Sequence, residues 1–403
     1  MAQDPQTGVA LCTPRRRRWA RILLIVVLAL LGLCALGAIA SALSNRTLPP
    51  PPEVLDRLTP ADKAGLREAL HVKAALGDSV WPGWGSADIP VILWNAEYEF
   101  LVGVEQAPGW EPVPEDTFDG RPFLRRPADD PQNFAVPVAD TYAGCLATHY
   151  EMDAFLRETF GEMIPDPLDA VVPWRLILQS TEVHISGVLH ETFHAYQTMV
   201  APERLEAAER AHRLGERYRT ADGEMREAWG TEIDLLARAL GAETESEAAD
   251  LARQFLAARA ARRDGLAEDL VDFERHIEWE EGLAKYVELG IWRAAYEAPE
   301  YTPVLAPSED AQFSAYRGYP QRWSQEVGQL RRQAGREGET RFYYTGMAQA
   351  NLLDRLLPGW QARALDEGVW LEDLLSGATA TDATEARAFG DDVRLGLSSG
   401  YVR

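Results

Sequence analysis

The sequence predicts an α+β protein in which one membrane-spanning helix precedes a strand-rich layer and a mainly helical body. Three observations lead to this prediction. They are a charge-free apolar run near the amino terminus, short apolar segments rich in β-branched and aromatic residues between positions 89 and 180, and helical periodicity from position 184 onward. The chain has 403 residues, of which 46% are hydrophobic and 26% charged, so it can bury a substantial core.

The first element is the apolar run Ile22 to Leu43, which contains no charged residue and is long enough to cross a bilayer. Arginines at 15 to 18 and at Arg21 precede it, and the positive-inside rule then places residues 1–21 in the cytoplasm and the rest of the chain outside. A cleaved signal peptide is the alternative, because the small residues at 38–42 form plausible cleavage sites. The length of the run favours a retained signal anchor.

Residues 44–60 follow as a proline-rich linker, which is expected to be stiff and extended, and residues 61–403 are predicted to form one domain. A short helix is expected over residues 54–76, and residues 110–118 are interpreted as a loop. Strands are expected at Ile89–Trp94, Tyr98–Val104, Asn133–Val138, Cys145–His149 and Trp174–Leu178.

The later part of the chain is predicted to be helical, because alanine, leucine, glutamate and arginine are frequent and apolar residues recur at helical spacing. Helices are expected at Glu203–Tyr218, Gly223–Leu240 and Ser246–Ile277. Residues 203–275 are interpreted as a helical insertion in the domain.

Charge and cysteine content limit the possible partners. The net charge is -23, and the first 46 residues are basic, so the remainder is strongly acidic. We therefore expect no nucleic acid as a partner. Cys145 is the one cysteine beyond the apolar run, so no internal disulfide is expected there. The sequence does not indicate an oligomeric state.

The most informative motif is His-Glu-x-x-His at residues 190–194. On a helix, His190 and His194 lie on one face, and both imidazoles can bind one zinc ion. Glu191 would stand beside the open coordination position as the general base for a water molecule whose pKa the zinc lowers. Apolar residues flank the motif, and a buried cluster of this kind is costly unless a metal pairs with it. Two surface histidines on a helix are the alternative.

The third ligand is expected to be a carboxylate on a later helix. The run Glu281-Gly-Leu-Ala-Lys-Tyr286 resembles the zinc-ligand helix of the gluzincin metallopeptidases, in whose aminopeptidase branch Glu-Gly-Phe-Ala carries the ligand. The resemblance implies a zincin-like fold, Zn as the cofactor and Glu281 as the third ligand. Its small residues Gly282 and Ala284 would let this helix pack closely against the motif helix. The alternative third ligands are Glu278, Glu280 and His276.

The chain departs from the better-known gluzincins in two respects. The spacing from His194 to Glu281 is 87 residues, which is longer than in thermolysin or the aminopeptidases. Lys285 stands where thermolysin has an aspartate that orients a histidine, and Asp354 is a candidate replacement. Val200 stands where a metzincin would have its third histidine, so that class is excluded.

A third block, residues 342–360, resembles the segment that follows the ligand helix in peptidase-MA-like metallohydrolases. The resemblance implies a Tyr-x-x-Gly turn that opens a helix, and a tyrosine that donates a hydrogen bond to the oxyanion on the attacked carbonyl. Tyr343 and Tyr344 are the candidates, and Tyr344 is favoured because it directly precedes the predicted turn. The alternatives are that both rings only pack, or that His184 or Tyr286 is the donor.

Together these features predict a membrane-anchored, extracytoplasmic zinc-dependent hydrolase, with a peptide or protein as the substrate by analogy. An extended substrate would pair with an edge strand beside the motif helix. The alternative is a non-catalytic, membrane-tethered binding or scaffold protein with a structural or vestigial metal site. Glu191 favours the enzyme, because a degenerate site would usually have lost this residue first.

Overall fold

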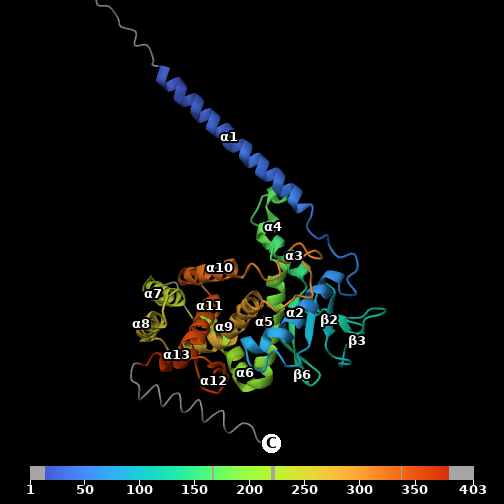
Figure 1. Cartoon of the computed structure of the whole chain (residues 1–403), viewed down its shortest axis with the longest axis vertical. Helices are drawn as coiled ribbons and strands as arrows, with labels where there is room; N and C mark the ends of the chain where they lie inside the picture. Colours follow the sequence, from blue (N-terminus) through green and yellow to red (C-terminus); the bar gives the residue numbers. More distant parts are fainter. Residues whose placement is uncertain (1–13, 166–167, 219–222, 337, 381–403) are drawn as a thin grey trace, which may run out of the picture. The chain divides into compact units, whose positions relative to one another are not determined.

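The computed structural model describes residues 14–165, 168–218, 223–336 and 338–380. Residues 1–13 of the predicted cytoplasmic segment and residues 381–403 of the predicted domain lie outside the described part. The chain forms two compact units. The smaller unit combines the amino-terminal segment up to Pro51 with Met152–Gln179, and the larger contains Pro52–Glu151 and the chain from Ser180 onward. Figure 1 labels their elements.

The smaller unit is built on one long apolar helix, α1 (Pro14–Asn45). The most apolar stretch of 18 residues within Ile22–Asn45 has a mean hydropathy of 3.1, and Ile22–Asn45 is long and apolar enough to span a membrane. A signal sequence would have the same properties. The predicted apolar helix is therefore confirmed, and it extends beyond the predicted boundaries at both ends because no helix breaker interrupts it. Its orientation stays a prediction.

Two short helical elements, η1 (Leu168–Val171) and α4 (Trp174–Ile177), pack against α1 in this unit. The prediction of a strand at Trp174–Leu178 is wrong. The amide of Leu178 donates to the carbonyl of Trp174 at 2.7 Å, which closes a helical turn. A strand needs a neighbouring strand, and this segment has the end of α1 beside it instead of the sheet.

The larger unit contains a six-stranded sheet, counted over the described residues, in the order β3-β4-β2-β1-β6-β5. Neighbouring strands are antiparallel except β1 and β6, which are parallel. The strands are β1 (Val91–Trp94), β2 (Tyr98–Val102), β3 (Glu111–Pro112), β4 (Leu124–Pro127), β5 (Phe134–Val138) and β6 (Thr141–Ala147). Four of the predicted strands are therefore present with shifted ends. The two at the β3 edge were missed, and β3 lies in a segment that was expected to be a loop.

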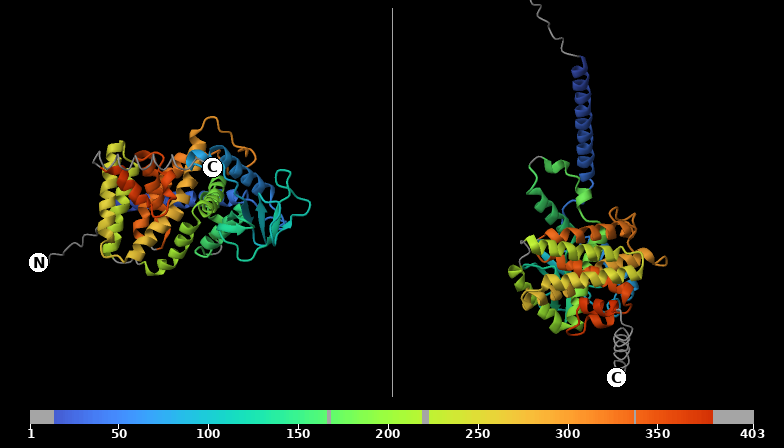
Figure 2. Two further views of the ribbon diagram at one scale, coloured as in Figure 1. Left: turned by 90° about the horizontal axis from the view of Figure 1, so that it is seen from below. Right: turned by 90° about the vertical axis from the view of Figure 1, so that its left-hand side faces the viewer.

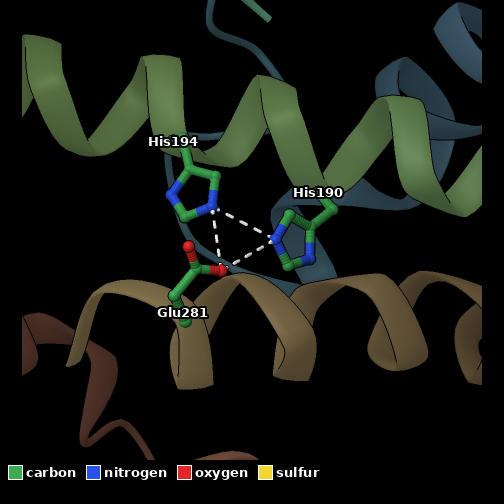
Figure 3. A group of neighbouring side chains, drawn as sticks. All are labelled: His190, His194 and Glu281. Atoms are coloured by element: carbon green, nitrogen blue, oxygen red, sulfur yellow. Dashed lines mark hydrogen bonds and ion pairs between the residues drawn. The ribbon is translucent and has the colours of Figure 1, made fainter. Parts of the chain in front are cut away.

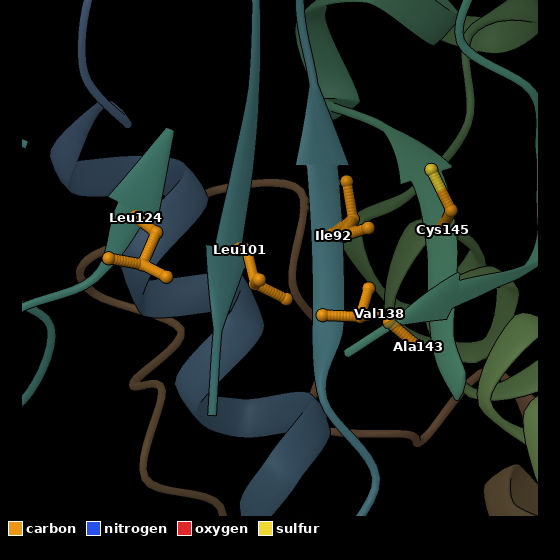
Figure 4. Close-up of a cluster of buried hydrophobic side chains, with 6 residues drawn as sticks. All are labelled: Ile92, Leu101, Leu124, Val138, Ala143 and Cys145. Carbon is orange, nitrogen blue, oxygen red and sulfur yellow. The ribbon is translucent and has the colours of Figure 1, made fainter. Parts of the chain in front are cut away.

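Alternating residues of β6 separate the two faces of the sheet. Ala143 and Cys145 point into a buried apolar cluster with residues of β1, β2, β4 and β5 (Figure 4). Gly144 and Leu146 face α5 (Thr181–Val200), the helix that carries the His-Glu-x-x-His motif. A Cβ atom at Gly144 would lie 2.5 Å from the backbone nitrogen of Thr192, so glycine allows α5 to lie directly on the strand.

The helical body lies on the other side of α5 from the sheet (Figures 1 and 2). Its long central helix is α9 (Glu268–Glu297), which packs against both α5 (Thr181–Val200) and α11 (Thr340–Leu356). The other helical elements of the larger unit are α2 (Pro60–Val80), α6 (Pro202–Ala211), η2 (His212–Arg217), α7 (Gly223–Leu240), α8 (Glu245–Arg263), α10 (Tyr319–Arg332), η3 (Gln333–Gly335), α12 (Gln361–Ala364) and α13 (Leu371–Thr379). Helix α3 (His149–Gly161) begins in the larger unit and continues into the smaller one.

The helix expected at Glu203–Tyr218 is α6 followed by the 3₁₀ helix η2. Two other predicted helices have different boundaries in the structure. The single helix expected over residues 246–277 is two helices, α8 and α9, separated at residues 264–267, where Gly265 adopts a φ of 85°. The helix expected over residues 54–76 begins at Pro60, because Thr59 and Asp62 form a capping box ahead of it. Both differences arise from local capping and turn chemistry that hydrophobic spacing alone does not reveal.

Candidate metal centre

Helix α5 is buried on nearly all sides, and this burial sets the environment of the motif. Phe193 packs edge-on against Trp81, with ring centroids 4.9 Å apart. On another side of the same helix, His190 and His194 face α9. The helix begins at Thr181, and the buried carboxylate of Glu182 in its first turn accepts hydrogen bonds from the backbone of the segment before α10. The motif is therefore held on a rigid element of the core.

Three ligand atoms converge between α5 and α9 (Figure 3). The Nε2 atoms of His190 and His194 are 3.1 Å apart, and they lie 3.3 Å and 3.5 Å from Oε2 of Glu281. Zinc bonds of 2.0–2.1 Å to nitrogen and oxygen would place tetrahedral ligands about 3.3 Å apart. Two imidazoles and one carboxylate are also a donor set that zinc prefers. The residues present therefore fit a zinc ion by both chemistry and spacing.

The electrostatics of this cluster favour a positive charge at its centre. Burial lowers the pKa of His190, but hydrogen bonds to Glu281 and Glu288 outweigh it and raise the pKa to about 10. Burial raises the pKa of Glu281, but the two histidines hold it well below its usual range. The carboxylates that stabilise a proton on the His190 imidazole would stabilise a metal ion in the same way. The arrangement is therefore suited to bind a cation.

The alternative third ligands are occupied elsewhere. The carboxylate of Glu278 accepts two hydrogen bonds from Arg259, at 2.8 Å and 2.5 Å, and one each from Thr345 and Gln349. Glu280 accepts from Nε2 of His212 at 2.9 Å. His276 lies edge-on to Trp370. Of these candidates on α9, Glu281 is the one whose carboxylate reaches both motif histidines.

Gln197 orients His194, and the sequence reading did not identify it. Its amide nitrogen donates to the carbonyls of Trp279 and Glu280 on α9, at 3.1 Å and 3.3 Å. Its amide oxygen then accepts from Nδ1 of His194 at 3.0 Å. The Nδ1 atom therefore carries the proton, and the lone pair of Nε2 points at the ligand cluster. The signal was available, because Gln197 lies three residues after His194 on the same helix face.

Glu288 lies beside the other histidine. Its Oε2 atom is 3.4 Å from Nδ1 of His190, while Lys285 and Arg322 bind its Oε1 atom at 2.9 Å and 3.1 Å. Seven residues separate Glu288 from Glu281, so both lie on the same face of α9. Lys285 therefore supports a carboxylate one turn further along the helix.

Asp354 does not take this role. It accepts hydrogen bonds from Tyr286 at 2.9 Å, Trp360 at 3.0 Å and Arg293 at 3.0 Å. The expectation that Asp354 orients a metal-binding histidine is therefore wrong, because its carboxylate accepts from these three side chains and from Gln361 of the helical body. Tyr286 is a packing residue in the same group.

Glu191 stands beside the ligand cluster in a buried position. Among the described residues its Oε2 atom has no hydrogen-bond partner. Burial raises the pKa of this carboxyl group, and the neighbouring histidines only partly oppose that effect. A buried carboxylate without a partner costs free energy, and such groups are frequent at functional sites.

The two candidate tyrosines face different carboxylates. The side chain of Tyr343 lies near Glu281, and the side chain of Tyr344 lies near Glu326. In both cases burial, together with the nearby carboxylates, raises the pKa of the phenol. Tyr344 was favoured from the sequence, but the geometry favours Tyr343 as the residue next to the metal ligands. A catalytic role for either residue stays a prediction.

The expected turn at Tyr-x-x-Gly is not present, because all four residues lie inside α11. Gly346 allows α11 to pack closely against α9. A Cβ atom added at Gly282 of α9 would lie only 2.6 Å from the Cα atom of Gly346. The expectation that Gly282 brings α9 close to α5 is also wrong, since this glycine faces α11. Glycine in a helix interior was read as a turn signal, whereas here it allows two helix backbones to touch.

Two further residues near the motif have defined environments. The Nε2–H group of His184 donates to the carbonyl of Ala147 at 2.9 Å, and its ring stacks on His149. Burial lowers the pKa of His184 to about 3, so it is a neutral packing residue. Phe134 of β5 contacts the ring of His194, with centroids 4.6 Å apart. Strand β5 is therefore the sheet edge beside the ligand cluster.

Comparisons of the chain with protein-family models, with curated proteins and with solved structures give no match. The functional conclusion therefore depends on the geometry of these residues.

Proposed function

We propose that this protein is a membrane-anchored zinc-dependent hydrolase that cleaves peptide bonds outside the cytoplasm. The observation that carries the proposal is the convergence of His190, His194 and Glu281 at tetrahedral spacing, with the unpartnered carboxylate of Glu191 beside them. Structural zinc sites use four protein ligands, whereas catalytic sites use three and leave one position open. The three ligands here therefore support catalysis over a structural or vestigial site in a scaffold protein.

Each residue of the site would have one role in the hydrolysis. His190, His194 and Glu281 would hold the zinc, which would supply Lewis-acid polarisation of a carbonyl group and lower the pKa of water. Glu191 would accept a proton from the attacking water and transfer it to the leaving amine. Tyr343, next to Glu281, would donate a hydrogen bond to the oxyanion.

Within the described residues β5 is an edge strand of the sheet, and this free edge supports a peptide as the substrate. An extended peptide can add to a free strand edge through main-chain hydrogen bonds, which do not depend on its sequence. Phe134 on this strand lies against His194, so a peptide paired with β5 would run past the ligand cluster. The strand edge would thereby place the scissile bond next to Glu191.

Metal content and proteolysis measured on the full-length chain in detergent test this proposal. The wild-type chain is expected to contain about one zinc ion and to hydrolyse fluorescently labelled casein. His194→Ala should lose both properties, while Glu191→Gln should keep the zinc and lose the hydrolysis, because an amide cannot accept the proton. His71→Ala, on the outside of α2, is the control and should change neither. A wild-type chain without zinc, or a zinc-loaded Glu191→Gln variant with full activity, would refute the proposal.

A further inference from the structure

The smaller unit contains a second feature besides the apolar helix. The segment Met152–Gln179 is joined to the end of α1 by side-chain to backbone hydrogen bonds. The amide nitrogen of Asn45 donates to the carbonyls of Ala170 and Val172, at 3.2 Å and 2.8 Å. The guanidinium group of Arg175 donates to the carbonyl of Thr47 at 2.9 Å. The segment is therefore held beside α1 by several contacts.

The contact covers the last two turns of α1. Residues Ala38, Ser41, Ala42 and Asn45 have the spacing of one helix face and are partly buried. Ile39 and Leu43 lie between them in sequence and remain 57% and 55% exposed. Small residues let another segment approach a helix closely, as in membrane helix packing. From position 38 to position 45 the helix rises about 10 Å, so the segment reaches alongside the apolar run itself.

The same segment exposes an unusual share of large apolar side chains. Outside α1, ten large hydrophobic side chains are exposed in the described part of the chain, and five of them fall within these 28 residues. They are Phe155, Phe160, Met163, Leu168 and Ile177. Phe155 and Met163 are 67% and 66% exposed. Concentrated exposure of this kind marks a surface that contacts a membrane or a protein.

We infer that Met152–Gln179 lies in the interfacial layer of the membrane that α1 spans, and forms a second membrane contact there. The argument for lipid is continuity, since the segment packs on the part of α1 that is apolar enough for the bilayer. Phe155, Met163 and Leu168 insert at the boundary between headgroups and acyl chains, as apolar side chains of interfacial helices do. The contact lies on the side of the membrane where the carboxyl-terminal end of α1 emerges. The inference therefore holds for either orientation of the chain.

The charge of the segment defines the type of lipid contact. Glu158 and Glu162 are exposed on the same segment, so anionic headgroups would not attract it. Insertion of apolar side chains therefore drives the association, and zwitterionic lipid is sufficient. The inference requires α1 to be a membrane span, and it does not require the chain to be a hydrolase.

Spin labels on the full-length chain in phosphatidylcholine nanodiscs test the inference. The native cysteines are first removed by the substitutions Cys12→Ser, Cys34→Ser and Cys145→Ala. Met163→Cys then provides the one thiol to which the spin label is attached. Accessibility to oxygen, which partitions into lipid, is compared with accessibility to a water-soluble nickel chelate. The matched control is a label at Val304, which is 45% exposed in the larger unit. Near-ultraviolet circular dichroism verifies that each labelled chain keeps its tertiary structure.

We expect the label at position 163, and a second one at position 168, to be more accessible to oxygen than to nickel. The label at position 304 should show the opposite ratio. Equal ratios at positions 163 and 304 would overturn the inference, because the segment would then lie in water. A label at 163 that neither reagent reaches would also overturn it, since a protein surface would then cover the segment. Release of a soluble chain by cleavage within α1 would overturn it too, while the zinc and casein measurements would be unaffected.

Discussion

Two side chains outside the motif orient the histidines of the ligand cluster. Gln197 and Glu288 contact the Nδ1 atoms of His194 and His190, while the Nε2 atoms of both histidines point at Glu281. Such contacts fix the tautomer and the orientation of a ligating imidazole. Each histidine is therefore oriented through its Nδ1 atom by a residue outside the His-Glu-x-x-His motif.

The contact between Glu288 and His190 leads to a prediction about metal affinity. Glu288→Gln removes the negative charge beside Nδ1 of His190, so zinc affinity should fall about 10- to 100-fold. Competition with a zinc chelator measures this change in the full-length chain. Glu326→Gln is the control, since Glu326 binds the same Lys285 and Arg322 without touching either histidine. An equal loss in both variants would assign the effect to the surrounding ion pairs.

The two tyrosines lead to a prediction about turnover. Tyr343→Phe should lower kcat by roughly 10²- to 10³-fold, because its hydroxyl is the one next to Glu281 and can donate to the oxyanion. Zinc content should remain that of the wild type. Tyr344→Phe should have a much smaller effect, since its side chain lies near Glu326 and not beside the ligand Glu281. A larger loss of kcat in Tyr344→Phe than in Tyr343→Phe would instead identify Tyr344 as the oxyanion donor, as the sequence predicts.

Helix α9 uses a different face for each neighbour. Glu281 and Glu288 face the histidines of α5, and Gly282 touches α11. Further toward its amino terminus, Glu274 and Glu278 bind buried arginines of α8. The position of the metal ligand therefore depends on how α9 packs on both sides.

The contact between α9 and α11 predicts the effect of a single methyl group. Gly282→Ala would place its Cβ atom 2.6 Å from the Cα atom of Gly346, and neither backbone can move freely. We expect a loss of roughly 1–3 kcal/mol in the free energy of unfolding, and a lower zinc affinity because Glu281 is adjacent. Gly230→Ala in α7 is the control: no atom lies within 4 Å, so it should stabilise the chain slightly. Urea titrations of both variants measure the difference, and equal stability would contradict the prediction.

A buried network of charges joins four helices of the larger unit. Arg259, Arg262 and Arg263 of α8 pair with Glu232 of α7, Glu274 and Glu278 of α9, and Glu372 of α13. Burial raises the pKa of Glu274 and of Glu372, but the arginines outweigh it and lower both values to about 2. Glu274 and Glu372 therefore keep their negative charge in the folded state at pH values where a free glutamate would be protonated.

This network predicts that the fold loses stability in acid. A carboxyl group whose pKa is lower in the folded state contributes stability above its unfolded pKa, and this contribution disappears as pH falls toward the folded value. The contribution of Glu274 and Glu372 to the free energy of unfolding should therefore be constant above about pH 5 and should be lost as the pH falls from 5 to 2. Urea titrations across this range, with a chelator present to exclude metal release, measure it. Equal stability at pH 3 and pH 7 would contradict the prediction.

The basic amino terminus leads to a prediction about topology. Five arginines before the apolar run should keep residues 1–21 in the cytoplasm, so an alkaline phosphatase reporter fused after Arg403 should be active outside. Replacing Arg15 to Arg18 and Arg21 by neutral residues should produce mixed orientations. A soluble chain that begins near Ser41 or Leu43 would instead identify α1 as a cleaved signal.

The features that the sequence by itself determined are those encoded by nearby residues. The apolar helix follows from composition, and the pairing of His190 with His194 follows from helical periodicity. The choice of Glu281 came from a local resemblance to a known ligand helix, and the geometry matches it. The tertiary structure alone decided which residues from distant segments meet: that Tyr343 lies beside Glu281, that Gly282 faces Gly346, and that β5 is the edge near His194. These outcomes depend on how helices and strands pack across long sequence separations, and local propensity carries no information about that packing.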